Sequence, residues 1–133
     1  MRFLIGSFLL FVSQIATAQA KDPSFAEISR CFFIYGAIVE VGRDERKPQL
    51  FQFAQSRVGW VSGYMQANQN NQAFKAVFDS GLSRNKQEGV RILDSLPSII
   101  SRKDQTQFSA VISRAADCDK ALGIRTAWIP PLE

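Results

Sequence analysis

Two cysteines lie near opposite ends of this chain, and whether they are bonded constrains the fold more than any other feature of the sequence. Cys31 and Cys118 are the only cysteines among the 133 residues. A bond between them would close a very long loop. By restricting the unfolded chain it would stabilise the fold by roughly 4 to 5 kcal/mol. The close Cys-x-x-Cys spacing of redox-active sites is absent. The bond therefore depends on where the chain folds.

The N-terminal segment, residues 1–20, has the order of a secretory signal peptide. Arg2 precedes an apolar stretch that runs to Val12, and an Ala-Gln-Ala motif ends at Ala20. An uncleaved membrane anchor is the alternative, but the apolar core is about half of the ~20 residues that cross a bilayer. We expect cleavage before Lys21, no stable membrane anchor and a periplasmic or secreted location. In such a compartment an even pair of cysteines is most simply a structural disulfide.

The remaining residues, 21–133, are expected to form a single domain, because chains of ~100 to 150 residues usually build one core. The formal net charge of the whole chain is +4, from 16 basic and 12 acidic residues. These charges are interleaved and form no long basic run. The sequence therefore does not indicate a nucleic-acid partner.

Apolar residues recur at helical spacing in several segments, which predicts an all-α bundle of four or five helices. The first helix is expected to begin after Ser24, which forms a capping box with Glu27, and to end at Gly42. A charged turn follows. Pro48 is then well placed as the first residue of the second helix, since its fixed backbone angle suits that position.

Later helix boundaries are predicted from turn and capping residues. A turn rich in glutamine and asparagine, residues 66–72, precedes a third helix, and a further helical run is expected to break or kink at Pro97. The last helix is expected to begin at Asp104, with Gln107 as its capping partner, and to end at Gly123. Both cysteines fall on apolar stripes, one on the first helix and one on the last. The tail, residues 124–133, is expected to be extended and to lie on the surface of the bundle.

The side chains available for catalysis are few. The chain has no histidine, which removes the commonest general base and metal ligand. With the cysteines bonded to each other, no thiolate nucleophile or ordinary zinc site remains. Asp117 and Asp119 lie two apart on a helix, so they point to different faces and are interpreted as solvated surface charges. We therefore expect no catalytic residues, no cofactor and no metal.

One face of the second helix is the leading candidate for partner binding. At about 100° per residue, five small or polar residues share the side opposite the apolar stripe. A glycine there costs up to ~1 kcal/mol relative to alanine, but it lets another backbone come close. That backbone belongs either to a partner protein or to the chain's own tail. The five residues are Gln52, Ser56, Gly59, Gly63 and Gln66.

A second candidate set on the same helix is Arg57, Trp60 and Tyr64, spaced so that together they could stack a ligand. The simpler interpretation is that the two rings flank the core and that the arginine extends over them into solvent.

These observations favour an exported, non-enzymatic protein that binds another protein, as an inhibitor, an immunity factor or an assembly accessory. The alternative is a carrier of a small apolar ligand, which the 11 phenylalanines would suit and which an internal cavity would support. A third hypothesis is a carboxylate-based cell-wall hydrolase, which requires a cleft with two facing acids.

Overall fold

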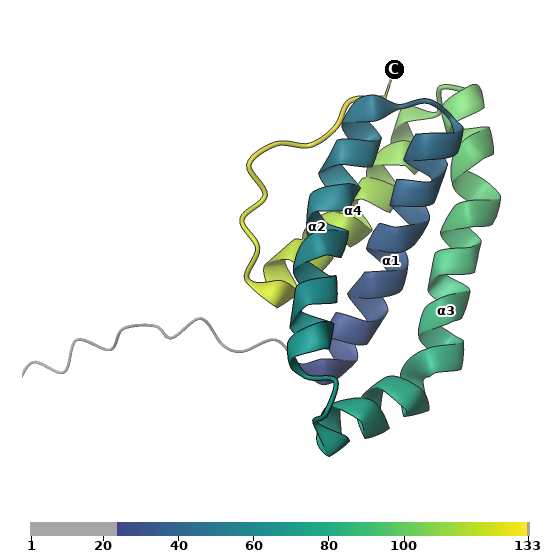
Figure 1. The fold of residues 1–133 in the computed structure, drawn as a ribbon. Helices are drawn as coiled ribbons and strands as arrows, with labels where there is room; N and C mark the ends of the chain where they lie inside the picture. The colour runs from purple at the N-terminus through teal and green to yellow at the C-terminus, as the bar shows by residue number, and fades with distance from the viewer. Residues whose placement is uncertain (1–23, 133) are drawn as a thin grey trace, which may run out of the picture.

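A computed structural model describes residues 24–132 of the protein as a four-helix bundle with an extended C-terminal tail (Figure 1). The expected all-α bundle closed by one disulfide is confirmed. The predicted signal peptide and its cleavage site lie outside the described residues. None of the helices in residues 24–132 contains an apolar stretch that could span a lipid bilayer. The helices are α1 (Phe25–Asp44), α2 (Pro48–Ala67), α3 (Gln72–Ser101) and α4 (Gln105–Leu122).

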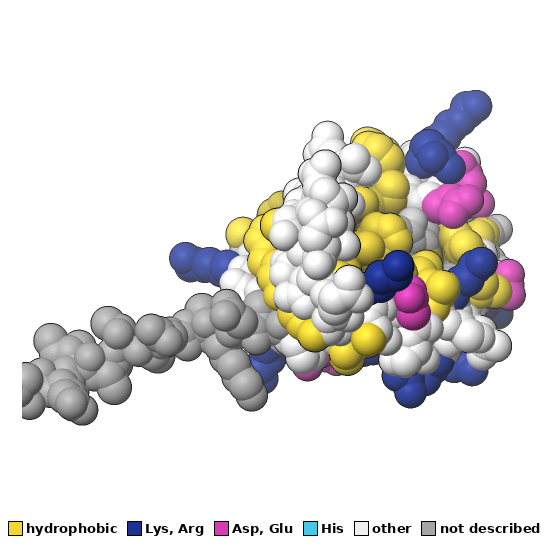
Figure 2. Space-filling view, turned by 60° about the horizontal axis from the view of Figure 1, so that its bottom comes forward, with side chains coloured by type: hydrophobic (Ala, Val, Ile, Leu, Met, Phe, Trp, Pro, Cys, Tyr) yellow, Lys and Arg dark blue, Asp and Glu magenta, His cyan; other side chains and the backbone are white. Residues whose placement is uncertain are grey.

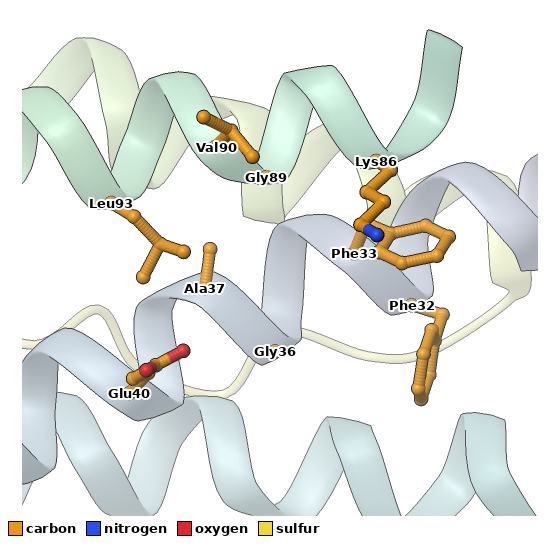
Figure 3. Close-up of a pocket in the computed structure, with 9 residues that line it drawn as sticks. All are labelled: Phe32, Phe33, Gly36, Ala37, Glu40, Lys86, Gly89, Val90 and Leu93. Atoms are coloured by element: carbon orange, nitrogen blue, oxygen red, sulfur yellow. The ribbon is translucent and has the colours of Figure 1, made fainter. Parts of the chain in front are cut away.

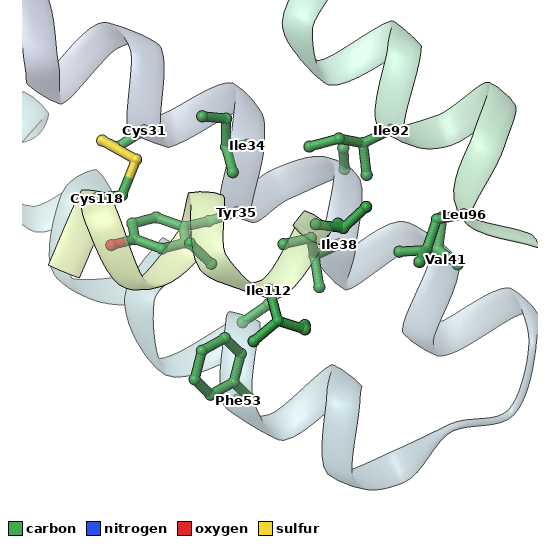
Figure 4. Packing of buried hydrophobic residues seen from close by; sticks show 14 of the residues in the cluster. Cys31, Ile34, Tyr35, Ile38, Val41, Phe53, Ile92, Leu96, Ile112 and Cys118 are labelled. Atoms are coloured by element: carbon green, nitrogen blue, oxygen red, sulfur yellow. A yellow bond between two sulfur atoms is a disulfide. The ribbon is translucent and has the colours of Figure 1, made fainter. Parts of the chain in front are cut away.

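Helix α1 is the centre of the bundle, and it contacts each of the other three helices. In Figure 1, α2 and α3 flank it on opposite sides and α4 lies behind. Ile28, Ile34 and Ile38 on α1 are almost completely buried. Figure 4 shows Ile34 and Ile38 among apolar side chains from the neighbouring helices. This central position explains why the middle of α1 is apolar nearly all round.

The helix ends follow the capping residues that the sequence indicates. The side chains of Ser24 and Asp104 each accept a hydrogen bond from the backbone N–H three residues on, at 3.1 to 3.2 Å. Asn71, which the sequence placed only in a turn, caps α3 in the same way through Phe74 N–H at 3.2 Å. Pro48 is the first residue of α2. Gly123 ends α4 with a left-handed backbone (φ 71°), which glycine adopts without strain.

The expected end of α1 at Gly42 is wrong, because α1 continues to Asp44. Gly42 is buried, and a Cβ atom at this position would lie 2.7 Å from the backbone nitrogen of Phe51 on α2. The glycine therefore allows the first turn of α2 to approach α1 closely. Arg46, with a positive φ of 54°, makes the turn between the two helices.

The expected break at Pro97 is also wrong. Helix α3 runs through this proline as one 30-residue helix, so two expected helical runs form a single element. A proline inside a helix costs ~3 kcal/mol. Leu96, Ile99 and Ile100 are all buried around it, and burying each such side chain contributes about 1.5 to 3 kcal/mol. Continuation of the helix is therefore favoured.

The predicted disulfide joins Cys31 on α1 to Cys118 on α4, with a Cα–Cα distance of 5.6 Å. Both residues are fully buried, and Figure 4 shows the bond beside the ring of Tyr35. The first and last helices are therefore linked covalently within the core.

Candidate functional site

Helix α2 carries both candidate sets of residues, and its inner side holds a buried ion pair. The Arg57 guanidinium binds the Asp119 carboxylate of α4 through both Nε and Nη2, each at 2.8 Å from an oxygen. Asp119 is fully buried and Arg57 is only 8% exposed. This two-point geometry is the strong form of an arginine–carboxylate contact. The pair therefore fixes α2 relative to α4.

Further hydrogen bonds complete this buried cluster. The Tyr35 hydroxyl on α1 donates to Asp119 Oδ1 at 2.7 Å. The Thr126 hydroxyl of the tail donates to Oδ2, also at 2.7 Å. Arg57 Nη1 donates to the carbonyl of Phe53 at 2.7 Å, and the guanidinium lies 3.8 Å from the centre of the Phe53 ring. The cluster thus joins three helices and the tail.

The same environment changes the acidity of Tyr35. Burial raises the pKa of its phenol far above the ordinary value, and the hydrogen bond to the Asp119 carboxylate raises the pKa further. Tyr35 therefore stays protonated and acts as a hydrogen-bond donor to the carboxylate.

These contacts correct two interpretations made from the sequence. Asp119 is not a solvated surface charge, whereas Asp117 is exposed as expected. Arg57 does not extend over Trp60 and Tyr64 into solvent, because its guanidinium turns inward to Asp119. The second candidate set is therefore divided. The two rings stack on each other with centroids 5.9 Å apart, and Trp60 is 41% exposed.

The outer side of α2 is open to solvent. All five residues of the leading candidate set are exposed. A Cβ atom added at Gly59 or at Gly63 would have nothing within 4 Å, so neither glycine is required by packing within the described chain. We call this surface the neutral face of α2. It consists of Gln52, Ser56, Gly59, Gly63 and Gln66 with the adjoining rings of Trp60 and Tyr64.

The C-terminal tail follows the bundle without covering the two glycines. As predicted, it is extended and lies on the surface (Figure 1). Its Trp128 packs edge-on against Phe53 of α2, with ring centroids 6.0 Å apart, and Pro130 is buried. The alternative in which the tail occupies the glycine surface therefore does not describe this structure.

The motifs of the sequence do not reveal that α2 exposes no charged side chain. Arg57 is the only charged residue between Lys47 and Lys75, and it is buried in the ion pair. The neutral face therefore carries no charge. In Figure 2, white and yellow side chains predominate toward α2, whereas most of the blue and magenta ones gather toward α3. The charge-free span is visible in the sequence and would have identified this surface.

Comparison with known proteins does not place the chain in a family. No protein-family model, curated protein or solved structure was found to match the chain. Within residues 24–132, no group of three or more histidine, cysteine, aspartate or glutamate side chains is placed to hold a metal ion.

Proposed function

We propose that this chain is an exported, non-enzymatic protein of the periplasm that binds another protein through the neutral face of α2. The observation that carries the proposal is the open space at Gly59 and Gly63, on an exposed surface without charges. Glycine in an exposed helix lowers helix stability by about 0.8 to 1 kcal/mol relative to alanine. Packing within the described chain offers no compensation, and close docking of a partner backbone would.

The chemistry of the surrounding surface supports a protein partner. Centres of protein interfaces are depleted in charged residues and enriched in aromatic ones. The neutral face combines amide side chains with an exposed tryptophan stacked on a tyrosine. Tryptophan and tyrosine are also frequent among the residues that contribute most to binding energy. Trp60 is accordingly the expected anchor of the interface.

The buried cluster supports a non-enzymatic role. Asp119, a fully buried carboxylate, accepts hydrogen bonds from Arg57, Tyr35 and Thr126. Its oxygens are occupied by these partners, so the carboxylate serves to hold the fold. The buried disulfide and the leader-like sequence of residues 1–20 support folding in an oxidising compartment.

Site-specific photocrosslinking in the producing cell tests this proposal. A photoreactive amino acid is placed at Gln52 or Gln66 on the neutral face and, as a matched control, at the exposed Thr106 of α4. We expect one crosslinked partner from both neutral-face positions and none from the control. Gly59→Leu, which has room at its position, should abolish the crosslink while the protein stays folded. A crosslink that persists in this variant, or that appears equally at Thr106, would refute docking on this face.

A further inference from the structure

A second open surface lies between α1 and α3, away from the neutral face. It is an apolar groove with a volume of about 290 Å³. Val90 on its rim is 43% exposed. Figure 3 shows α1 below α3, with the lining side chains between and beside them. The groove is lined by Phe32, Phe33, Gly36, Ala37, Glu40, Lys86, Gly89, Val90 and Leu93.

Two glycines lie in this groove, and the fold explains only one of them. A Cβ atom at Gly89 would lie 3.0 Å from the carbonyl oxygen of Phe33, so glycine there allows α1 and α3 to pack closely. A Cβ atom at Gly36 would have nothing within 4 Å. Gly36 therefore leaves a hollow in the middle of α1 that no other part of the described chain fills.

Two opposite charges lie at opposite ends of the groove. Helices α1 and α3 run in the same direction (Figure 1), and Gly89 is level with Phe33. Lys86, one turn before Gly89, is thus at one end, and Glu40, one turn after Gly36, is at the other (Figure 3). Within residues 24–132 neither side chain has an ion pair or hydrogen bond, with each other or with a third residue. Gly36 lies about midway between them along α1.

The geometry points to a second copy of this chain as the occupant of the groove, in a twofold dimer whose axis passes over the outer surface of α1 near Gly36. Such an axis lies in the interface, at right angles to the line from Lys86 to Glu40. Rotation about it makes the two α1 helices antiparallel. It places Glu40 of each copy against Lys86 of the other, so one contact is made twice, as a twofold interface requires.

The same arrangement accounts for the other features of the groove. Gly36 lies close to the axis, where the two α1 helices cross, and its missing side chain lets their backbones approach. Phe32, Val90 and Leu93 gain apolar cover that they lack in one copy alone. An unrelated protein would need to supply both charges in this order, whereas a second copy supplies them by symmetry. The dimer does not use the neutral face of α2 and is independent of the proposed function.

Charge reversal tests the pairing. The protein is purified with its disulfide intact, and the dimer dissociation constant is measured by analytical ultracentrifugation. Glu40→Lys and Lys86→Glu each place like charges together twice across the interface, so each should weaken the dimer by about tenfold or more. The double variant restores opposite charges and should recover the wild-type constant to within about threefold. The control is Lys75→Glu, an equivalent reversal on α3 outside the groove, which should leave the constant unchanged.

A steric variant tests the crossing point independently. A Cβ atom at Gly36 would meet nothing within 4 Å, so we expect Gly36→Leu to fold with an unchanged helical circular dichroism spectrum. By filling the hollow it should abolish the dimer. Three results would each overturn the proposal: a wild-type protein that is monomeric at several hundred micromolar, a dimer that tolerates Gly36→Leu, or a double charge reversal that fails to restore association.

Discussion

The two sides of α2 differ in charge and in packing. The inner side contains the helix's only charged residue, Arg57, which is held by Asp119 and by the carbonyl of Phe53. The outer side has no charge, and its two glycines have no neighbours. In the described part of the chain, every buried side-chain nitrogen and oxygen has a hydrogen-bond partner. The buried polar groups on the inner side therefore find all their hydrogen-bond partners within the chain.

This difference separates the residues that the fold requires from those that it does not. If Arg57 were removed, Asp119 would remain buried without its counter-charge, so the inner side cannot change alone. If Gly59 became alanine, the helix would gain stability and lose no contact. Packing within the described chain therefore does not require glycine at this position, and docking of a partner is the reason that we propose for it.

The largest expected effect is on the inner side. Asp119→Ala should lower the free energy of unfolding by about 3 to 5 kcal/mol, because it leaves the Arg57 guanidinium buried without its partner. Asp117→Ala, which removes an exposed carboxylate two residues away, should change that free energy by less than about 0.5 kcal/mol. Urea denaturation measures both variants. If the two behave alike, the ion pair contributes little and the contrast between the sides of α2 is lost.

A smaller effect distinguishes glycines that the fold requires from those that it does not. Gly42→Ala should destabilise the protein by about 1 to 3 kcal/mol, because its Cβ would meet the backbone of Phe51 at 2.7 Å. Gly59→Ala and Gly63→Ala should each stabilise it by up to about 1 kcal/mol through helix propensity. Thermal unfolding gives the sign for each variant. A loss of stability at Gly59 would show that the outer side also has an internal role.

The protonation of Tyr35, which contacts the inner side of α2 through Asp119, should make the stability of the protein depend on pH. Because burial raises the pKa of its phenol in the folded state, the unfolded chain loses this proton first, near pH 10. The contribution of Tyr35 to stability is therefore complete below about pH 10 and falls by about 1.4 kcal/mol per pH unit above it. Between pH 9 and pH 11, the stability of wild type relative to Tyr35→Phe should fall by about 1.4 kcal/mol. A constant difference would mean that the phenol is accessible to solvent.

The smallest effect on stability is expected on the outer side. Gln52→Lys and Gln66→Glu add a charge to an exposed surface, so each should change the free energy of unfolding by less than about 0.5 kcal/mol. The same variants should weaken partner binding, since an interface centre disfavours a new unpaired charge. Crosslinking yield is measured for Gln52→Lys with the photoreactive residue at Gln66, and for Gln66→Glu with it at Gln52. Urea denaturation of the same two proteins separates loss of binding from loss of stability. Full crosslinking in both variants would contradict docking on the neutral face.

The sequence predicted features that depend on neighbouring residues. The caps at Ser24 and Asp104 and the first-turn proline at Pro48 act within one helical turn, and each was confirmed. The functions assigned to Gly42 and Pro97 were wrong because contacts with other helices determine them. Glycine is needed at position 42 because α2 packs closely against it. Helix α3 continues through Pro97 because the apolar residues around this proline are buried.

The buried cluster was beyond prediction from local spacing. Arg57 and Asp119 are 62 positions apart, and no rule of helix periodicity pairs them. A partial signal was present, since Asp119 lies one turn after Ala115 and next to Cys118, on the apolar side of its helix. The exposure of Gln52, Gly59 and Gln66 followed directly from helical periodicity.

The position of the disulfide gives the protein a distinctive response to mechanical force. Cys31 and Cys118 are 87 positions apart, and the bond encloses most of α1, all of α2 and α3, and most of α4. Tension applied at the two ends of the chain passes from α1 through the two sulfur atoms to α4 and bypasses everything between them. Only the segments outside the bond can be drawn out, at roughly 3.3 to 3.6 Å per residue. Under load, residues 31–118 therefore remain one covalent ring, and a single cut in any loop of this ring leaves both fragments covalently joined.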